Sequence, residues 1–297
     1  MEISIRPVES SADYAAWRQV RVAVLPDDRA PTVEELRAQA GPSHRYVVAE
    51  LDGVLAGSGF VGKSDLAGMA SVAPRVLSAF RRRGVGSAML RLLARQAVAM
   101  GFTIAAANAA DAGSARFAEQ HGFREVDREI EQVRVIGAEP LAQAPCGVTI
   151  VPVSTQPGLW LAAYKSVAAQ AFQDMATVAV LDVTPEQWQR DWITDPDAMF
   201  IAVAANEVIG CAGLVPDPDH PGRAEHALTA VRRDWRHRGV ATALKRTTLA
   251  WAAANGFTEV YTWTQIGNDS MRDLNTYLGF VARSESIRMQ TDLPLQT

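Results

Sequence analysis

The chain has 297 residues, 48% of them hydrophobic and 21% charged, which is the composition of a globular protein and a length that favours two domains. Its formal net charge of −4, from 29 basic and 33 acidic residues, supplies no global positive field, so we expect no nucleic-acid partner. No apolar run reaches the ~18 residues of a membrane span and the first residues lack the layout of a secretory signal, so we expect a cytoplasmic protein without a membrane partner.

Hydrophobic periodicity and turn signals predict the same order of elements in both halves of the chain. In the first half we predict strands at 3–8, 45–50, 54–61, 69–77, 103–107 and 124–135, and helices at 12–24, 32–39, 84–100 and 112–121. In the second half we predict strands at 148–153, 199–205, 207–215, 224–232, 258–264 and 280–290, and helices at 158–171, 185–193, 239–255 and 268–278. Strands and helices that alternate in this way indicate a mixed α/β layout.

The two halves share this order because the chain repeats itself. The stretches that begin at Val76 and at Val231 have valine, arginine, arginine, glycine and valine at equal spacing. Between the halves, residues 137–146 lose their hydrophobic periodicity and contain proline and glycine, which is typical of a linker. We therefore predict an N-terminal domain at 1–136, a linker at 137–146 and a C-terminal domain at 147–297.

Each repeated stretch places an Arg-x-x-Gly-x-Gly/Ala run between a strand and a helix. Glycine lets the backbone approach a ligand closely, and the free amide hydrogens of a first helical turn attract an anion together with the helix dipole. A pyrophosphate fits such a helix start. Because the run lacks Gly-Lys-Ser/Thr, it is not the P-loop of a nucleoside triphosphate site.

These residues resemble the acyl-CoA signature of the GNAT acetyltransferase superfamily, in which a strand that ends in valine precedes the glycine run. The resemblance implies two tandem GNAT folds, each a mixed α/β fold with a mostly antiparallel central sheet flanked by helices, and acetyl-CoA as cosubstrate. In the second half, the cofactor-binding residues that it implies are Val231, Arg233, Arg236, Arg238, Gly239, Val240, Ala241 and Thr242. In the first half they are Val76, Arg81, Arg83, Gly84, Val85, Gly86 and Ser87.

The second half is also similar to family members that read Asn-x-x-Met-x-x-x-Asn-x-x-Leu-Gly-Phe near their ends. Asn268, Met271, Asn275 and the Leu-Gly-Phe of residues 278–280 match this longer pattern. It is more specific than the glycine run alone. The resemblance therefore adds Asn268 to the cofactor-binding candidates.

The chemistry that the family resemblance implies is direct attack of an amine on the thioester, with a base for the amine and an acid for the departing thiolate. Glu225, near the start of the strand at 224–232, is the candidate base. His226 faces the other side of that strand because side chains alternate, and we expect one of the two to act. Many family members carry a tyrosine acid where this chain has Asn275. The other catalytic candidates are therefore Asn275 itself, as a hydrogen-bond donor, and the nearby Tyr277, although two residues swing a helical side chain by about 200°.

We therefore predict an acyl-CoA-dependent N-acetyltransferase that acetylates a primary amine of a small molecule, with catalysis in residues 147–297. The strand before the first signature, residues 68–76, carries no carboxylate, so we expect the first half to bind acyl-CoA without catalysis or to shape the acceptor pocket. One alternative is a non-catalytic acyl-CoA sensor or assembly module. Another, within enzymes, is a cysteinyl-amine acceptor as in mycothiol synthase, which is also a two-repeat member.

The remaining expectations concern metals, disulfides and assembly. Cys146 and Cys211 lie far apart without histidines at ligand spacing, so we predict neither a metal site nor a disulfide. A monomer is the expected form, with a dimer as the alternative, because two fused repeats can replace the pairing of single-domain relatives.

Overall fold

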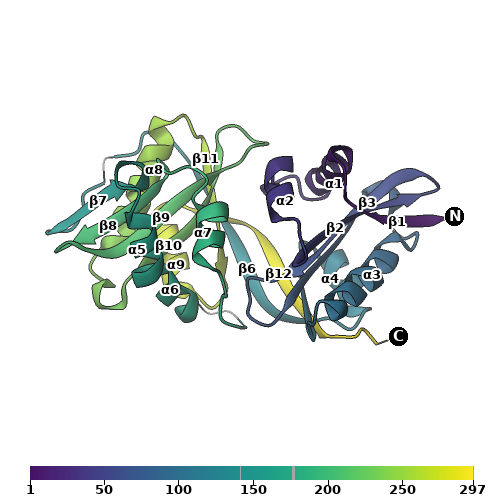
Figure 1. Ribbon diagram of the computed structural model, residues 1–297. Helices are drawn as coiled ribbons and strands as arrows, with labels where there is room; N and C mark the ends of the chain where they lie inside the picture. The colour runs from purple at the N-terminus through teal and green to yellow at the C-terminus, as the bar shows by residue number, and fades with distance from the viewer. Residues whose placement is uncertain (141, 176–177, 297) are drawn as a thin grey trace. The chain divides into compact units, whose positions relative to one another are not determined.

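The computed structural model describes residues 1–140, 142–175 and 178–296, and the chain forms two compact units. The first unit comprises Met1–Asp127 and Ser286–Thr297, and the second comprises Arg128–Glu285. Each unit is built on a sheet with helices against it (Figure 1).

The first unit contains most of the N-terminal repeat. Its strands are β1 (Ile3–Pro7), β2 (His44–Leu51), β3 (Val54–Lys63), β4 (Ala70–Val76), β5 (Ile104–Ala109) and the second half of β12 (Val281–Asp292), in the order β1-β2-β3-β4-β5-β12. The α-helices are α1 (Ser11–Val24), α2 (Val33–Gln39), α3 (Val85–Ala99) and α4 (Ala112–Glu119), with a 3₁₀ turn at Ser78–Phe80. The strands pair antiparallel except β4 with β5.

The second unit repeats this architecture. Its strands are β6 (Arg124–Val135), β7 (Val148–Pro152), β8 (Met199–Ala204), β9 (Glu207–Pro216), β10 (Arg223–Val231) and β11 (Glu259–Gln265), in the order β6-β11-β10-β9-β8-β7. The α-helices are α5 (Leu159–Ala163), α6 (Ala169–Asp174), α7 (Pro185–Trp192), α8 (Val240–Ala254) and α9 (Asp269–Tyr277), with a π-helical segment at Tyr164–Ala168 and 3₁₀ turns at Val153–Thr155 and Arg233–Trp235. Here β10 and β11 are the parallel pair. The predicted fold class, mixed α/β with a mostly antiparallel sheet, is confirmed.

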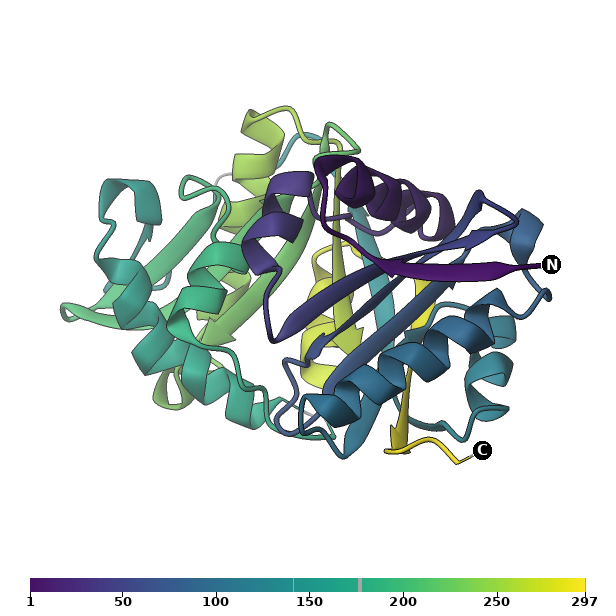
Figure 2. The same cartoon turned by 45° about the vertical axis from the view of Figure 1, so that its right-hand side comes forward.

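Alternate residues of the strands face two helical layers, as strand geometry requires. In β8, Met199 and Ile201 pack in one core with Trp188 of α7. Phe200 and Ala202 face the other way, and they share a core with α8 (Figure 1). In the first unit α3, which Figure 2 shows in blue along its sheet, packs on one face, and α1 and α2 pack on the other.

The last strand of each repeat pairs with a strand of the other repeat. Although β6 follows the first repeat in the sequence, its residues Glu129 to Val135 pair with β11 in the second unit. Residues Ile287 to Asp292 of β12 pair with β5 in the first unit. The boundaries between the two units therefore lie inside β6 and β12. Of the linker that we predict at 137–146, residues 137–140 and 142–146 belong to the second unit, and residue 141 lies outside the described residues. The difference arises because backbone ladders, rather than proximity in sequence, decide where these strands lie.

A buried carboxylate fixes β6 in the second unit. Glu131 is 2% exposed and accepts hydrogen bonds from Arg223 of β10 and from Arg283 and Ser284 of β12. Arg223 Nε also donates to Glu259 Oε1 of β11, at 2.6 Å. Buried charges are tolerated when they are paired and hydrogen-bonded. This network therefore ties β6 to the strands beside it.

The substitution Glu131→Gln removes the negative charge while it keeps the size of the side chain. It leaves the buried Arg223 with less compensation, and we expect it to lower the free energy of unfolding by about 3–5 kcal/mol. Glu285→Gln is the matched control, because it breaks an exposed ion pair with Arg128 and should change the free energy of unfolding by less than about 1 kcal/mol. Urea unfolding of the three proteins measures both effects. Equal losses in the two variants would contradict the role of the buried network.

Candidate active site

Both repeats begin a helix at a glycine in the left-handed region. Gly84 precedes α3 with a φ of 86° and Gly239 precedes α8 with a φ of 77°, a backbone conformation that other residues rarely adopt. The first bond of each helical ladder runs from Ala88 to Gly84 and from Ala243 to Gly239. The amide hydrogens before these bonds therefore have no acceptor within their helix. Each helix start has the set of donors that an anion such as a pyrophosphate needs.

The first arginine of each signature closes the loop that leads to the helix. Arg81 Nε donates to the carbonyl of Val76 at 3.2 Å, and Arg236 Nε donates to the carbonyl of Val231 at 3.0 Å. The acceptor in each repeat is the last residue of the strand, so the bond holds the strand end and the loop together. This contact gives the arginine of the motif a structural role in both units.

Asp174, the last residue of α6, holds two of the arginines that we predicted as cofactor-binding. It forms ion pairs with Arg233 and Arg236, and the hydrogen bonds from Arg233, followed by those from Arg236, lower the pKa of Asp174 to about 2. Arg238 is exposed and lies over the ring of Trp235 at 4.9 Å. The positive charge beside this helix start is therefore partly compensated within the second unit.

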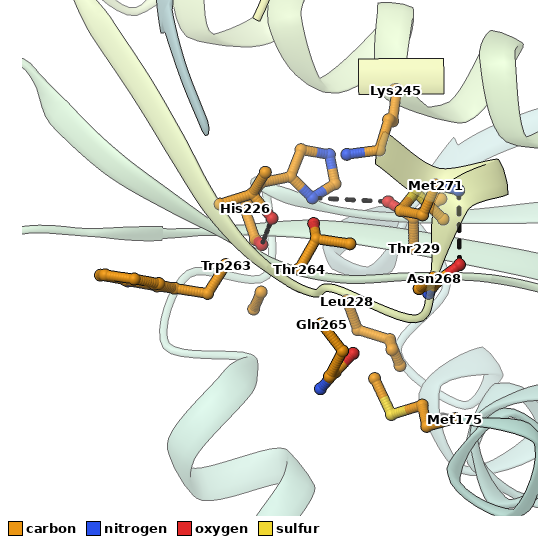
Figure 3. Close-up of a pocket in the computed structure, with 12 residues that line it drawn as sticks. Met175, His226, Leu228, Thr229, Lys245, Trp263, Thr264, Gln265, Asn268 and Met271 are labelled. Atoms are coloured by element: carbon orange, nitrogen blue, oxygen red, sulfur yellow. Dashed lines mark hydrogen bonds between the residues drawn. The ribbon is translucent and has the colours of Figure 1, made fainter. Parts of the chain in front are cut away.

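β10 contains an extra residue beyond the point where it pairs with β11. The pairing of β10 with β9 changes register between His226 and Thr229, which is a β-bulge. The parallel pairing of β10 with β11 is present at Arg223 to Glu225, before the bulge. A pocket lies beyond that point, between the diverging strands, and residues of α8 and α9 complete its wall (Figure 3).

The bulge also decides which side of the sheet each residue faces. Before it, Ala224 packs in the core that includes Leu249 of α8. After it, Leu228 and Ala230 pack in the core of α5 to α7, so the parity of the strand has changed. Glu225 therefore shares a face with Leu228, and His226 lies on the α8 side.

Two buried titratable side chains, Lys245 and His226, lie on the α8 side of the pocket. They are 1% and 2% exposed, and Figure 3 shows the amino group of Lys245 beside the imidazole. Thr248 Oγ1 donates to the carbonyl of Lys245 and lies 3.1 Å from His226 Nε2. Since the hydroxyl proton is already used, Nε2 carries the ring proton and donates to Thr248.

Burial changes the charge state of both groups. It lowers the pKa of Lys245 to about 7, far below that of an ordinary lysine. Burial, and after it the charge of Lys245, holds the pKa of His226 well below its usual value. His226 is therefore neutral at pH 7, while Lys245 is divided between its charged and neutral forms.

The opposite side of the pocket, toward α5 to α7, is the side of Glu225. Tyr261 donates a hydrogen bond from its hydroxyl to Glu225 Oε2 at 3.4 Å. Trp263 follows Tyr261 by two residues, so it lies on the same face of β11, where it lines the pocket. Glu225 itself lies next to the pocket rather than among its lining residues. The candidate base and Lys245 thus flank the opening from opposite sides of the sheet.

Asn275 and Tyr277 lie in very different environments although both are on α9. Asn275 is fully buried and donates from Nδ2 to Gln132 Oε1 at 2.9 Å and to Thr264 Oγ1 at 3.3 Å. Its Oδ1 has no hydrogen-bond partner among the described residues. Tyr277 is 69% exposed and accepts a hydrogen bond from Arg246, outside the pocket. The turn of the helix between the two positions produces this contrast.

Asn268 lines the pocket and caps α9. Its side-chain oxygen accepts a hydrogen bond from the amide of Met271 at 3.3 Å (Figure 3). An asparagine at this position satisfies one of the free donors of a helix start. The Asn-x-x-Met spacing in the sequence therefore has a local structural cause.

The first unit keeps the helix start but has no bulge in its corresponding strand. β4 pairs with β3 in continuous register from Val76 to Ala70. At the start of α3, Ser87 Oγ lies 3.1 Å from His121 Nε2, and a side chain at Gly86 would meet Phe117 at 3.4 Å. The two repeats therefore differ in the register of the strand that precedes the helix start.

The sequence patterns do not predict Lys245, Thr264 or Gln132 as residues of the site. A signal for Lys245 is present, because a lysine interrupts the apolar stripe of α8 between Leu244 and Leu249. Gln132 lies on β6, and only the strand pairing brings it to Asn275. No pattern within the second repeat could have predicted that contact.

Two further findings concern the class of protein. None of the helices that the structure describes has both the length and the apolar character needed to cross a membrane. Within residues 1–140, 142–175 and 178–296, no three His, Cys, Asp or Glu side chains gather as metal ligands do.

Comparison with known proteins identifies related chains. The family model described as "Acetyltransferase (GNAT) family" matches twice, over residues 12–123 and 165–280. A mycothiol acetyltransferase of Salinispora arenicola (strain CNS-205) is 30% identical over 143 residues, which cover 48% of this chain and 46% of that protein. The match thus spans about half the length of this curated relative.

Two solved structures share the fold over nearly the whole chain. A tandem GNAT protein from the clavulanic acid biosynthesis pathway aligns with a TM-score of 0.76 and 18% identity, covering 100% of both chains. A GCN5-related N-acetyltransferase from Sphaerobacter thermophilus aligns with a TM-score of 0.72 and 20% identity, covering 98% of this chain and 95% of its own.

The substitution Lys245→Met tests whether the buried amine titrates in the folded protein. The pKa of lysine is near 10.4 in an unfolded chain and about 7 for Lys245 in the fold, so the unfolded state binds the proton more tightly. Stability of the wild type is therefore lost as the pH falls from about 10 to about 7. We expect the stability of the variant, relative to wild type, to be about 3 kcal/mol greater at pH 7 than at pH 10, measured by urea unfolding. A pH-independent difference would contradict this titration.

Proposed function

Because the chain belongs to the acetyltransferase (GNAT) family, we propose that it transfers the acetyl group of acetyl-CoA to a primary amine of a small molecule, at the pocket between β10 and β11. The observation that carries the proposal is, within the second unit, a glycine-led helix start beside a pocket that the bulged β10 lines together with β11. The first unit has the same helix start, and its β4 pairs with β5 only at Ala70 and Ser71, but β4 has neither a bulge in its pairing with β3 nor a carboxylate. We therefore assign catalysis to the second unit.

The α8 side of the second unit fits the phosphate and pantetheine parts of acetyl-CoA. The amides of Val240, Ala241 and Thr242 would hold the pyrophosphate, and Gly239 keeps side-chain atoms away from it. The pantetheine arm would then follow β10 from Val231 toward the pocket, which places the thioester between the diverging strands. Residues Gly84 to Ser87 offer a similar helix start in the first unit, where acyl-CoA would bind without turnover.

The amine would reach the thioester from the side of α5 to α7. Glu225 lies on that side, bonded to Tyr261, and would accept the proton of the amine directly or through water. Because the acetyl donor would lie on the α8 side, the amine could attack the thioester carbon from the opposite face. The relative named mycothiol acetyltransferase makes a cysteinyl amine the first acceptor to test.

A non-catalytic acyl-CoA sensor is the second candidate, and one observation favours it. The position at which many family members place a tyrosine acid holds Asn275, which is buried and bonded through its amide. Tyr277 is exposed outside the pocket, so its participation as an acid would need a different conformation of α9. A sensor would bind acetyl-CoA without releasing CoA in the presence of any amine.

The substitution Thr242→Asp tests which helix start binds acetyl-CoA. An aspartate in the first turn suits the helix dipole but repels a phosphate, so the protein should fold while its affinity for acetyl-CoA falls on the order of tenfold or more. Ser87→Asp is the matched change in the first unit, and Thr242→Asn and Ser87→Asn are the neutral controls. Calorimetric titration of acetyl-CoA measures all four. Loss of binding with Ser87→Asp alone would move the proposed site to the first unit.

Removal of the candidate base should slow the reaction without preventing acetyl-CoA binding. Glu225→Gln is expected to lower kcat by about 100-fold or more and to abolish the acidic limb of the pH profile. Glu186→Gln, an exposed carboxylate on α7, is the control. Release of CoA is followed with a panel of cysteinyl amines, amino sugars and polyamines. Binding of acetyl-CoA without CoA release from any amine would support the sensor instead.

A further inference from the structure

Lys245 is a buried amine on α8. The residue is 1% exposed, and the face of the Phe280 ring lies 5.4 Å from its Nζ. A buried ammonium is costly, so leucine would serve a purely structural role better at this position. Figure 3 shows the amine directed toward the imidazole of His226, and both residues line the pocket. The chain therefore carries a costly reactive group at the place where the strands diverge.

The position of Lys245 along α8 relates it to the proposed acetyl-CoA site. It lies five residues after Val240, so the rise of the helix places it about 7.5 Å along the axis from the helix start. If the phosphates of acetyl-CoA bind at the start of α8, the pantetheine arm that runs from them into the pocket would pass on the α8 side. Lys245 lies on this side, whereas Glu225 lies on the other.

We propose that Lys245 is the acid of the reaction, which protonates the sulfur of CoA as the thioester breaks. This inference rests on the proposed function. The amine nitrogen bonds to the acetyl carbon, the carbon–sulfur bond breaks, and its electron pair stays on sulfur. The Lys245 ammonium gives its proton to that pair and becomes a neutral amine. The proton that the acceptor amine loses leaves on the Glu225 side, and Lys245 regains a proton from water, so the charges balance.

The surroundings of Lys245 suit proton donation to a thiolate. Its pKa of about 7 lies below the ~8.5 of an ordinary thiol, so the transfer is favourable. His226 on β10 is the titratable group beside it, and its pKa is held too low for it to be the acid. The neighbouring pocket residues of β11 and α9 are Thr262, Thr264 and Met271, which carry no charge.

The other acid candidates have weaker positions. Asn275 is an amide and cannot release a proton near neutral pH. The hydroxyl of Tyr277 is bonded to Arg246 on the exposed side of α9. Lys245 is thus the pocket residue with a transferable proton on the side where the sulfur would lie.

The test measures the pKa of the thiol of bound CoA as well as the rate of turnover. Lys245→Met removes the proton donor, and Lys245→Arg keeps the charge but holds its proton too tightly to donate it. Lys165→Met, an exposed lysine of the same unit, is the matched control. The thiolate absorbance of CoA bound to each protein is titrated against pH, and kcat and KM for acetyl-CoA are measured across the same range.

We expect the pKa of the bound thiol to be lower by one unit or more in Lys245→Arg, which stays charged beside the sulfur, and to be unchanged in Lys245→Met and Lys165→Met, because Lys245 is already neutral where the thiol ionises. Turnover should fall about 100-fold in both Lys245 variants with little change in KM, and remain at the wild-type level in Lys165→Met. An unchanged kcat in a folded Lys245→Met protein, or an unchanged thiol pKa in a folded Lys245→Arg protein, would overturn this proposal and leave the proposed function standing. Acetylation of Lys245 found by mass spectrometry would also overturn it, because an amide nitrogen cannot donate the proton. A wild-type protein that binds no acetyl-CoA would overturn the proposed function as well.

Discussion

Pairing of β6 with β11 is the constraint on which the second unit depends. The strand follows the first repeat in the chain, yet its residues from Glu129 to Val135 complete the sheet that carries the candidate site. Glu131 secures it through buried ion pairs with Arg223 and Arg283. Next to Glu131, Gln132 accepts a hydrogen bond from the side-chain amide of Asn275. The strand thus completes the sheet and also sets the orientation of a side chain beside the pocket, so the C-terminal repeat is not structurally independent.

The extra residue in β10 distinguishes the second unit from the first. It lies beyond the pairing with β11 and reverses the face that later residues occupy, so Glu225 and Leu228 lie on one side and His226 and Thr229 on the other. The rate of a reaction between two substrates rises when both are held in the correct relative position, here from opposite sides of the sheet. In the first unit, β4 pairs with β3 in uninterrupted register, so its residues keep one alternation from Ala70 to Val76. The same sequence motif therefore leads to different structures in the two repeats.

Charge is distributed unevenly around this opening. Near the helix start, Arg233 and Arg236 are already paired with Asp174, which leaves the backbone amides as the donors best placed for an anion. Inside the pocket, Lys245 has no ion pair among the residues that the structure describes, and burial lowers its pKa to about 7. An amine that can both hold and release a proton at pH 7 is suited to acid–base chemistry, whereas a paired arginine is not. Protein packing, rather than residue type alone, produces this difference between Lys245 and the two arginines.

The sequence by itself determined the fold class, the repeat and the membership of the acetyltransferase (GNAT) family, because periodicity, glycine positions and helix starts are local properties. It also indicated that Gly84 and Gly239 each open a helix, since a left-handed residue before a helix is encoded within a few positions. Only the tertiary structure decided that Gln132 meets Asn275, that Lys245 faces His226 in the pocket, and that Tyr277 lies outside it. These relations depend on strand pairing across more than a hundred residues and on one inserted residue in β10, and neither leaves a periodic trace in the chain.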